Sequence, residues 1–282
     1  MELATIRTPD GATSAAIRSD QRWMPLAAAN LSALLGRPDW SQQAVAALAR
    51  PVKAGIPAGE VKLELPLPAP GKIICCGLNY ADHILEMGRG LPNYPTLFAK
   101  FADTLTGPGE HINIPSRAQG AVDWEAELAV VVGAPLRQAD DDEAREAIAG
   151  YTLANDISMR DWQNRTAQWL QGKAFDATTP IGPVLVTPDE FDSDEGIEIN
   201  CQVNGALRQR GNTKNLVFAP AKLLAYISQF TTLRPGDIVL TGTPGGVGMG
   251  RRPPLYLADG DTVVIEATRL GRLENTIRFN NN

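Results

Sequence analysis

Three carboxylates could form a binding site for a divalent cation. Glu125 and Glu127 occur in the stretch VDWEAELAVVVG (122–133), and Asp156 occurs in ANDISMRD (154–161). Side chains alternate between the two faces of a strand, so Glu125 and Glu127 point the same way, roughly 7 Å apart along the chain. The following residues are apolar on both faces, which predicts a buried strand, and buried carboxylates must be paired, protonated or bound to a cation. A hard divalent cation meets this requirement, with Asp156 as a third ligand. The alternative is a half-exposed strand whose acids form salt bridges with arginines.

A histidine and a glutamate lie three positions apart in the stretch GLNYADHILEM (77–87). On a helix, His83 and Glu86 would share a face. A carboxylate beside an imidazole orients it and supports its charged form, which suits a general base. The alternative is a solvated pair on a surface helix. The other histidine, His111, has no such partner, and we expect it to be structural.

A glycine-rich loop follows a strand-like run in VLTGTPGGVG (239–248). It has neither the Lys-Ser/Thr ending of a P-loop nor the spacing G-x-G-x-x-G, so the sequence gives little support to a nucleotide site. Backbone amides and threonine hydroxyls in such a loop can bind a small carboxylate. A tight turn without a ligand is the alternative.

The elements that must position these groups are mostly strands. Strand patterns bounded by glycine or proline occur in KIICCG (72–77), ELAVVVG (127–133), IEINCQVNG (197–205), DIVLTG (237–242) and DTVVIEA (261–267). Helical stretches are expected at Ser41–Arg50, Asp82–Met87, Asp141–Ile148, Ser158–Leu170 and Pro220–Gln229. This pattern predicts a β-rich α+β protein rather than a regular βαβ alternation.

The proline-rich segment LPLPAPG (65–71) predicts a stiff linker, because proline fixes φ and disfavours a helix before it. We therefore expect a small N-terminal domain at residues 1–65 and a catalytic domain at residues 66–282.

The bulk properties are those of an ordinary cytoplasmic enzyme. The formal net charge of −6 over 282 residues argues against a nucleic-acid partner. No signal peptide and no apolar run of about 18 residues is found, so we expect no membrane segment. Cys75, Cys76 and Cys201 are odd in number and lack C-x-x-C spacing, which predicts free thiols in the core.

Six motifs together resemble the fumarylacetoacetate hydrolase family over about residues 70 to 280. In chain order they are GLNYADHILEM, VDWEAELAVVVG, YTLANDISMRDWQ, GKAFDATTPIGP, VNGALRQRGNT and DIVLTGTPGGVG. The resemblance implies the mixed β-sandwich roll of that family, with a small N-terminal domain and assembly as a homodimer.

The resemblance also implies a role for each candidate residue. The expected ligands of Mg²⁺ or Mn²⁺ are Glu125, Glu127 and Asp156. The expected catalytic residues are His83 and Glu86 on a lid helix, together with Lys173 and Gln163. The expected substrate-binding residues are Thr241, Gly242 and Thr243, which would hold a carboxylate, and Arg160, whose role is mostly structural. Each position carries the residue type that the family pattern requires.

Such a site suits a small 2-oxo acid, whose enolate a divalent cation would stabilise. The same enolate arises by C–C bond hydrolysis, decarboxylation or isomerisation. The complete His-x-x-Glu pair favours hydrolysis, in which His83 activates water while Lys173 and Gln163 stabilise an oxyanion. We therefore expect a hydrolase of an acylpyruvate or a fumarylacetoacetate-like 2,4-dioxo acid. The alternative is a decarboxylase or isomerase of a 2-oxo dicarboxylic acid, of the oxaloacetate decarboxylase or 2-hydroxyhepta-2,4-diene-1,7-dioate isomerase type. A non-catalytic binding protein is a further alternative.

Overall fold

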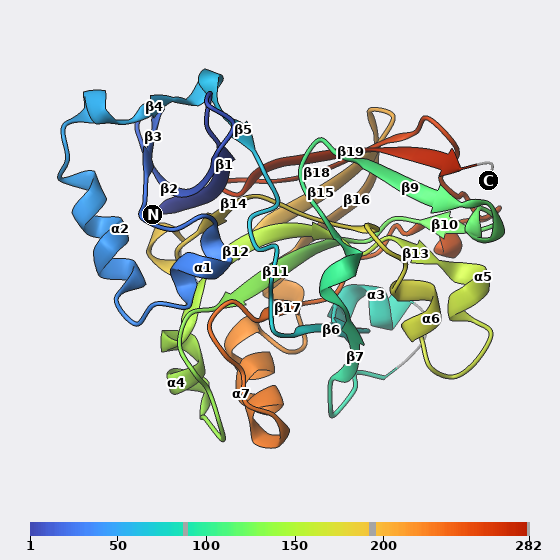
Figure 1. The fold of residues 1–282 in the computed structure, drawn as a ribbon. Helices are drawn as coiled ribbons and strands as arrows, with labels where there is room; N and C mark the ends of the chain where they lie inside the picture. The colour runs from blue at the N-terminus through green and yellow to red at the C-terminus, as the bar shows by residue number, and fades with distance from the viewer. Residues whose placement is uncertain (87–89, 192–195, 281–282) are drawn as a thin grey trace.

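The computed structural model describes residues 1–86, 90–191 and 196–280, apart from the side chains of His83 and Glu86 (Figure 1). Within these residues, two sheets contain all of the strands except β10 and β13. The larger sheet contains β1 (Glu2–Arg7), β2 (Thr13–Ser19), β3 (Arg22–Pro25), β4 (Ile56–Pro57), β5 (Lys62–Leu63), β6 (Ile73–Gly77), β7 (Thr96–Lys100), β8 (Leu105–Thr106), β11 (Ala126–Val132), β12 (Ile148–Asn155), β14 (Thr179–Val186) and β17 (Ile238–Leu240). Its main path runs in the order β4-β3-β2-β1-β14-β12-β11-β17-β6-β7.

A second sheet lies against one face of the first (Figure 1). It runs in the order β16 (Ala206–Asn212), β15 (Glu198–Val203), β18 (Thr262–Ala267), β19 (Gly271–Asn280) and β9 (His111–Pro115). A short ladder of β10 (Val122–Asp123) and β13 (Ser158–Met159) lies beside the two sheets. The mixed, β-rich α+β fold predicted from the sequence is confirmed.

Strand β11 is central because both of its faces are covered. All seven of its residues are buried. Ala126 and Leu128 face the core shared with the second sheet, whereas Ala129 and Val131 face a cluster that includes the N-terminal strands. A strand that is buried on both sides has an apolar run without alternation, as the sequence ELAVVVG predicted.

The helices are short and lie mainly at the margins of the larger sheet (Figure 1). Those described are α1 (Leu31–Leu35), α2 (Trp40–Leu48), α3 (Ala81–Glu86), α4 (Asp141–Glu146), α5 (Arg160–Gln163), α6 (Leu170–Lys173) and α7 (Pro220–Phe230). Helix α4 begins with a capping box formed by Asp140 and Glu143, and α7 begins with proline in its first turn, where the missing N–H costs nothing.

The continuous helix predicted for residues 158–170 is wrong. Ser158 and Met159 form β13 instead, pairing with Asp123 and Val122, and the helix ends at Gln163. The Thr166 hydroxyl accepts a hydrogen bond from the Gln168 amide at 3.2 Å, a local turn that competes with helix. Helix α6 starts only at residue 170. This break lets two separate short helices approach the carboxylates.

The N-terminal strands continue the larger sheet, because β1 pairs with β14, Leu3 opposite Leu185. Leu3 and Met24 also share a buried cluster with Ile73 and Val131. The division into units 1–65 and 66–282 stays a prediction about independent folding.

All three cysteines are free and buried, as predicted. Burial, with a smaller contribution from Glu127, raises the pKa of Cys76 to about 12. No helix within the described residues is long and apolar enough to cross a membrane.

Candidate active site

The three predicted ligand carboxylates come together at the junction of β11 and β12. Glu125 directly precedes β11, Glu127 is its second residue, and Asp156 directly follows β12. Antiparallel pairing places Ala126 opposite Asn155, and the Asp156 amide donates to the Glu125 carbonyl at 2.9 Å. One carboxylate oxygen from each residue lies within 4.8 Å of the others. Their relative exposures are 8%, 1% and 0%, so the half-exposed alternative is wrong.

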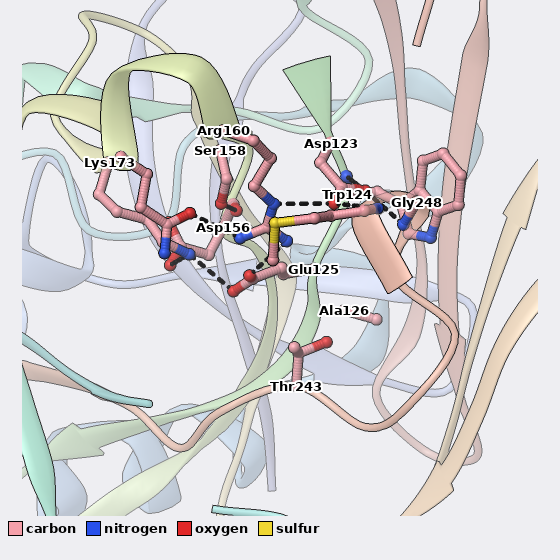
Figure 2. A network of polar contacts seen from close by, with 12 residues as sticks. Asp123, Trp124, Glu125, Ala126, Asp156, Ser158, Arg160, Lys173, Thr243 and Gly248 are labelled. Atoms are coloured by element: carbon pink, nitrogen blue, oxygen red, sulfur yellow. Dashed lines mark hydrogen bonds and ion pairs between the residues drawn. The ribbon is translucent and has the colours of Figure 1, made fainter. Parts of the chain in front are cut away.

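Three buried cations surround these carboxylates. The Lys173 ammonium donates to Glu125 Oε2 at 2.7 Å and to Asp156 Oδ2 at 2.8 Å (Figure 2). Arg160 Nη2 forms an ion pair with Glu125 Oε1 at 2.7 Å. Lys100, the last residue of β7, forms an ion pair with Asp156 Oδ1. Among the described residues, Glu125 and Asp156 each form ion pairs with two positively charged side chains, whereas Glu127 forms none.

The pKa values follow from this pattern of partners. Burial alone would raise the pKa of Asp156, but Lys100 and Lys173 lower it by more, so its pKa lies below the usual range. Burial alone would lower the pKa of Lys173, but Asp156 and Glu125 raise it by more. The pKa of Glu127 is well above its usual range because of burial, then the nearby Asp156 and Glu125.

The donor set fits a hard divalent cation. The three residues offer carboxylate oxygens only, the ligand type that Mg²⁺ and Mn²⁺ prefer. Within the described part of the chain, Glu127 has no ion-pair partner and accepts only from the Gly242 amide, at 2.7 Å. A nearly fully buried carboxylate in that position lacks compensation for its charge, and a cation would supply it.

A further buried acid, Asp123, ties the glycine-rich loop to this cluster. Its two oxygens accept from Gly248 N at 2.6 Å, Met249 N at 2.9 Å and Arg160 Nε at 2.8 Å. Gly248 is required here, since an added Cβ would lie 1.9 Å from the Leu255 carbonyl oxygen. Asp123 therefore fixes both the far end of the loop and the guanidinium that contacts Glu125 (Figure 2).

The near end of the loop is tied to Glu127, one of the three candidate ligands. Gly242, with φ of +97°, directs its amide to Glu127. The Thr241 hydroxyl donates to the Leu128 carbonyl at 3.0 Å and is fully buried, whereas Thr243 is only partly buried. Figure 2 shows Thr243 on the loop facing Glu125 and Ala126. Of the two threonine hydroxyls, that of Thr243 is the one placed to meet a ligand.

Gln163 and Arg160 lie on the same short helix, α5. Arg160 Nη1 donates to Gln163 Oε1 at 2.8 Å, and both residues are buried. The pKa of Arg160 lies above its usual range, because Glu125 and Asp123 outweigh the effect of burial. Arg160 thus contacts Asp123, Glu125 and Gln163, and its mostly structural role stays a prediction.

His83 and Glu86 lie on α3, as the sequence predicts, but their side chains are outside the described residues. The start of α3 is anchored to the loop by Asn79, whose Nδ2 donates to the Thr241 carbonyl at 2.8 Å. The same amide contacts the backbone of Phe218. The helix that carries the expected base therefore begins directly beside the glycine-rich loop.

The sequence interpretation missed two charged members of the site. Lys100 ends the segment TLFAK and, like most lysines at strand ends, gave no signal of burial. Asp123 stands within the motif VDWEAE, two positions before Glu125, and that i, i+2 relation to a ligand was a signal that could have identified it.

Comparisons with known proteins identify the family of the chain. The family model for the fumarylacetoacetate (FAA) hydrolase C-terminal region matches residues 72–278. A mitochondrial oxaloacetate tautomerase of Xenopus laevis is 46% identical over 219 residues, 77% of this chain and 68% of that protein. The structure of a 5-carboxymethyl-2-hydroxymuconate delta-isomerase from Mycobacterium smegmatis is 33% identical, with a TM-score of 0.81, covering 99% of this chain and 100% of that one. A fumarylacetoacetate hydrolase from Exiguobacterium antarcticum is 30% identical, with a TM-score of 0.87 and the same coverage. The chain belongs to the fumarylacetoacetate hydrolase family.

Proposed function

We propose that the protein is a divalent-metal-dependent tautomerase or isomerase of a 2-oxo dicarboxylic acid, with oxaloacetate as the first candidate substrate. The observation that carries the proposal is the buried cluster of Glu125, Glu127 and Asp156 with the ammonium of Lys173 between two of them. The relatives support the choice of reaction, since the 46% identical protein is named an oxaloacetate tautomerase and the 33% identical structure an isomerase. These names favour the alternative over the hydrolase that the His-x-x-Glu pair suggested.

In this proposal Glu125, Glu127 and Asp156 would hold a cation, which would supply Lewis-acid polarisation of the 2-oxo group. Keto–enol conversion requires one proton to leave C3 and one to reach the 2-oxygen. Lys173 remains an ammonium because its acidic neighbours raise its pKa, so it can donate a hydrogen bond to the oxygen that gains negative charge. His83 is the expected group that takes the C3 proton. The loop at Gly242 and Thr243 would hold the carboxylate.

The experiment follows the ultraviolet absorbance of enol oxaloacetate after the pure keto or enol form is added. We expect Mg²⁺ or Mn²⁺ to accelerate equilibration above the uncatalysed rate and EDTA to abolish the acceleration. Pyruvate release measured in parallel detects decarboxylation. Glu127→Gln should lose the acceleration, whereas Glu64→Gln, a matched change at a glutamate paired with Arg7 outside the site, should keep it.

The hydrolase is a second candidate because the structure with a TM-score of 0.87 is that of a fumarylacetoacetate hydrolase. Metal-dependent cleavage of acetylpyruvate or fumarylacetoacetate without tautomerisation of oxaloacetate would select it. His83→Ala should then remove hydrolysis, because water activation needs the base.

Assembly and location remain part of the same proposal. We expect a homodimer, which light scattering after size-exclusion chromatography would test. A cytoplasmic protein without nucleic-acid or membrane partners also remains our expectation from the sequence.

A further inference from the structure

One motif of the sequence, VNGALRQRGNT, has no role in the proposed chemistry. It covers the turn between β15 and β16 and all of β16, at the edge of the second sheet. Gln209, in the middle of β16, is 1% exposed although it is polar. A buried amide must be hydrogen-bonded, so its partners indicate what it holds in place.

The partners of Gln209 all belong to the candidate site. Its Oε1 accepts from the Ala126 amide at 3.0 Å, between the two ligand glutamates. Its Nε2 lies 2.7 Å from Thr243 Oγ1 and 2.8 Å from the Pro244 carbonyl oxygen, both on the glycine-rich loop. The side chain of Gln209 therefore joins strand β11 to the glycine-rich loop.

The backbone partners fix the orientation of this amide. The Ala126 N–H can only donate and the Pro244 carbonyl can only accept, so Oε1 and Nε2 cannot be exchanged. The Thr243 oxygen must consequently accept from Nε2. A threonine hydroxyl has a single hydrogen, and within the described residues the Thr243 hydroxyl donates it to no partner. That hydrogen remains free to point into the site.

Close backbone packing holds the loop against β16. A Cβ on Gly211 would lie 2.5 Å from the Pro244 side chain, and a Cβ on Gly246 would lie 2.2 Å from the Arg208 carbonyl oxygen. Only glycine permits such approaches without displacing the chain. The contact of Gln209 with the loop is therefore part of a rigid junction between the second sheet and the site.

We propose that Gln209 is a positioning residue that makes the Thr243 hydroxyl a donor to a carboxylate oxygen of the substrate. This role of Gln209 rests on the proposed 2-oxo acid function. It assigns the VNGALRQRGNT motif to substrate recognition. By accepting from Ala126, Gln209 also keeps the backbone between Glu125 and Glu127 at a fixed distance from the loop. It acts on the substrate through Thr243 and touches neither the substrate nor the cation.

A double-mutant cycle tests the assignment. The variants are Gln209→Met, which keeps the size but removes the hydrogen bonds, Thr243→Val, and the double variant. The measurements for each variant are KM and kcat for oxaloacetate with Mg²⁺, and the dissociation constant of oxalate by calorimetry. Gln202→Met, a partly buried glutamine of β15 whose partner is Glu266, is the matched control.

We expect each single change to raise KM and the oxalate dissociation constant about tenfold, the size of one lost hydrogen bond to a charged group, with kcat changed less than threefold. The double variant should be no weaker than the weaker single variant, because both changes remove the same interaction. The affinity for Mn²⁺ alone should change much less than that for oxalate. Gln202→Met should leave all values unchanged.

Additive effects of the two changes in the cycle would overturn the assignment. A lower melting temperature of Gln209→Met without a change in KM and oxalate binding would also overturn it. If Gln209→Met does not fold, the variant Gln209→Glu is used in its place. The new carboxylate would keep the hydrogen bond from the Ala126 amide, but the Thr243 hydroxyl would have to donate its hydrogen to this carboxylate. That variant should bind oxalate more weakly than wild type, and equal binding would also overturn the assignment. Absence of oxaloacetate turnover by the wild type would refute the proposed function alone, because the oxalate cycle still decides the role of Gln209.

Discussion

Replacing Glu127 with glutamine separates the stability of the protein from its affinity for a cation. Glutamine has the shape of a protonated glutamate, and its amide oxygen can still accept from the Gly242 amide, which now donates to Oε2 at 2.7 Å. The change removes one of three ligand carboxylates and one buried negative charge. We expect opposite effects on the two properties.

The magnitudes follow from the geometry. Ligand oxygens of the three acids all lie within 4.8 Å of one another, and two full charges at that distance repel by about 3.5 kcal/mol at an effective dielectric constant of about 20. The pKa of Glu127 is raised by burial, then by Asp156 and Glu125, which favours its neutral form and reduces this cost. Without divalent metal, Glu127→Gln should therefore be as stable as wild type or more stable, by about 1 kcal/mol.

Added Mg²⁺ should reverse this order. At a concentration of about 100 times its dissociation constant, a ligand that binds only the folded state adds about 2.7 kcal/mol, which corresponds to about 5 °C in a chain of this size. Wild type should gain this increment and Glu127→Gln should not. Melting curves with EDTA and with increasing Mg²⁺ measure both effects, and Glu64→Gln should retain the full gain. A magnesium-dependent gain of the same size in Glu127→Gln would refute the assignment of Glu127 as a ligand.

Three further predictions concern other buried groups. Lys100→Met should lower the free energy of unfolding by about 3 kcal/mol in urea titrations, because it breaks a buried pair with Asp156, and a loss under about 1 kcal/mol would contradict that pairing. Gly242→Ala should lower the affinity for oxalate in the presence of Mg²⁺ at least tenfold, since its φ of +97° and a Cβ 2.8 Å from the Cys76 carbonyl oxygen would displace the loop; unchanged affinity would show that the loop shape is not needed. The three cysteines should not react with a thiol-specific disulfide reagent at pH 8 until the protein is unfolded, because all are buried and the pKa of Cys76 is raised to about 12; rapid labelling of the native protein would contradict their burial.

The sequence predicted those parts of the site that depend on neighbours along the chain. The pair Glu125 and Glu127 was recognisable because a buried strand fixes their spacing. Asp156 was assigned through the resemblance of the motif YTLANDISMRDWQ to the family. Lys100 was not recognisable in this way, since it meets Asp156 across 56 positions and only through the order of β7, β6, β17 and β11 in the sheet. Gln209 was missed for the same reason, as its partners come from a different sheet.

The limits of the fold prediction have the same origin. Strand patterns such as that of β11 are local and were predicted correctly, whereas the strand at Ser158 and Met159, where a helix was predicted, depends on β13 pairing with β10, a contact between distant segments. The proline-rich segment after residue 65 suggested a boundary, yet β1 joins the same sheet as the rest of the chain through β14. The propensity of a sequence predicts the local conformation of a segment, whereas tertiary pairing determines which sheet the segment joins.

The distribution of charge explains why this site could hold a cation from outside the chain. Within the described residues, Asp156, Glu125 and Asp123 each have an ion pair with lysine or arginine, and Glu127 has only a backbone amide. A cation bound there would complete the set of partners. It would also bring a double positive charge next to Lys173, where an anionic substrate is stabilised more strongly than a neutral one. The same glycine-rich loop contacts Glu127 at Gly242 and carries Thr243, so one continuous segment would connect a proposed ligand of the cation with the proposed site of the substrate carboxylate. We therefore expect a divalent cation and a 2-oxo acid to strengthen each other's binding, because each neutralises charge that the other brings.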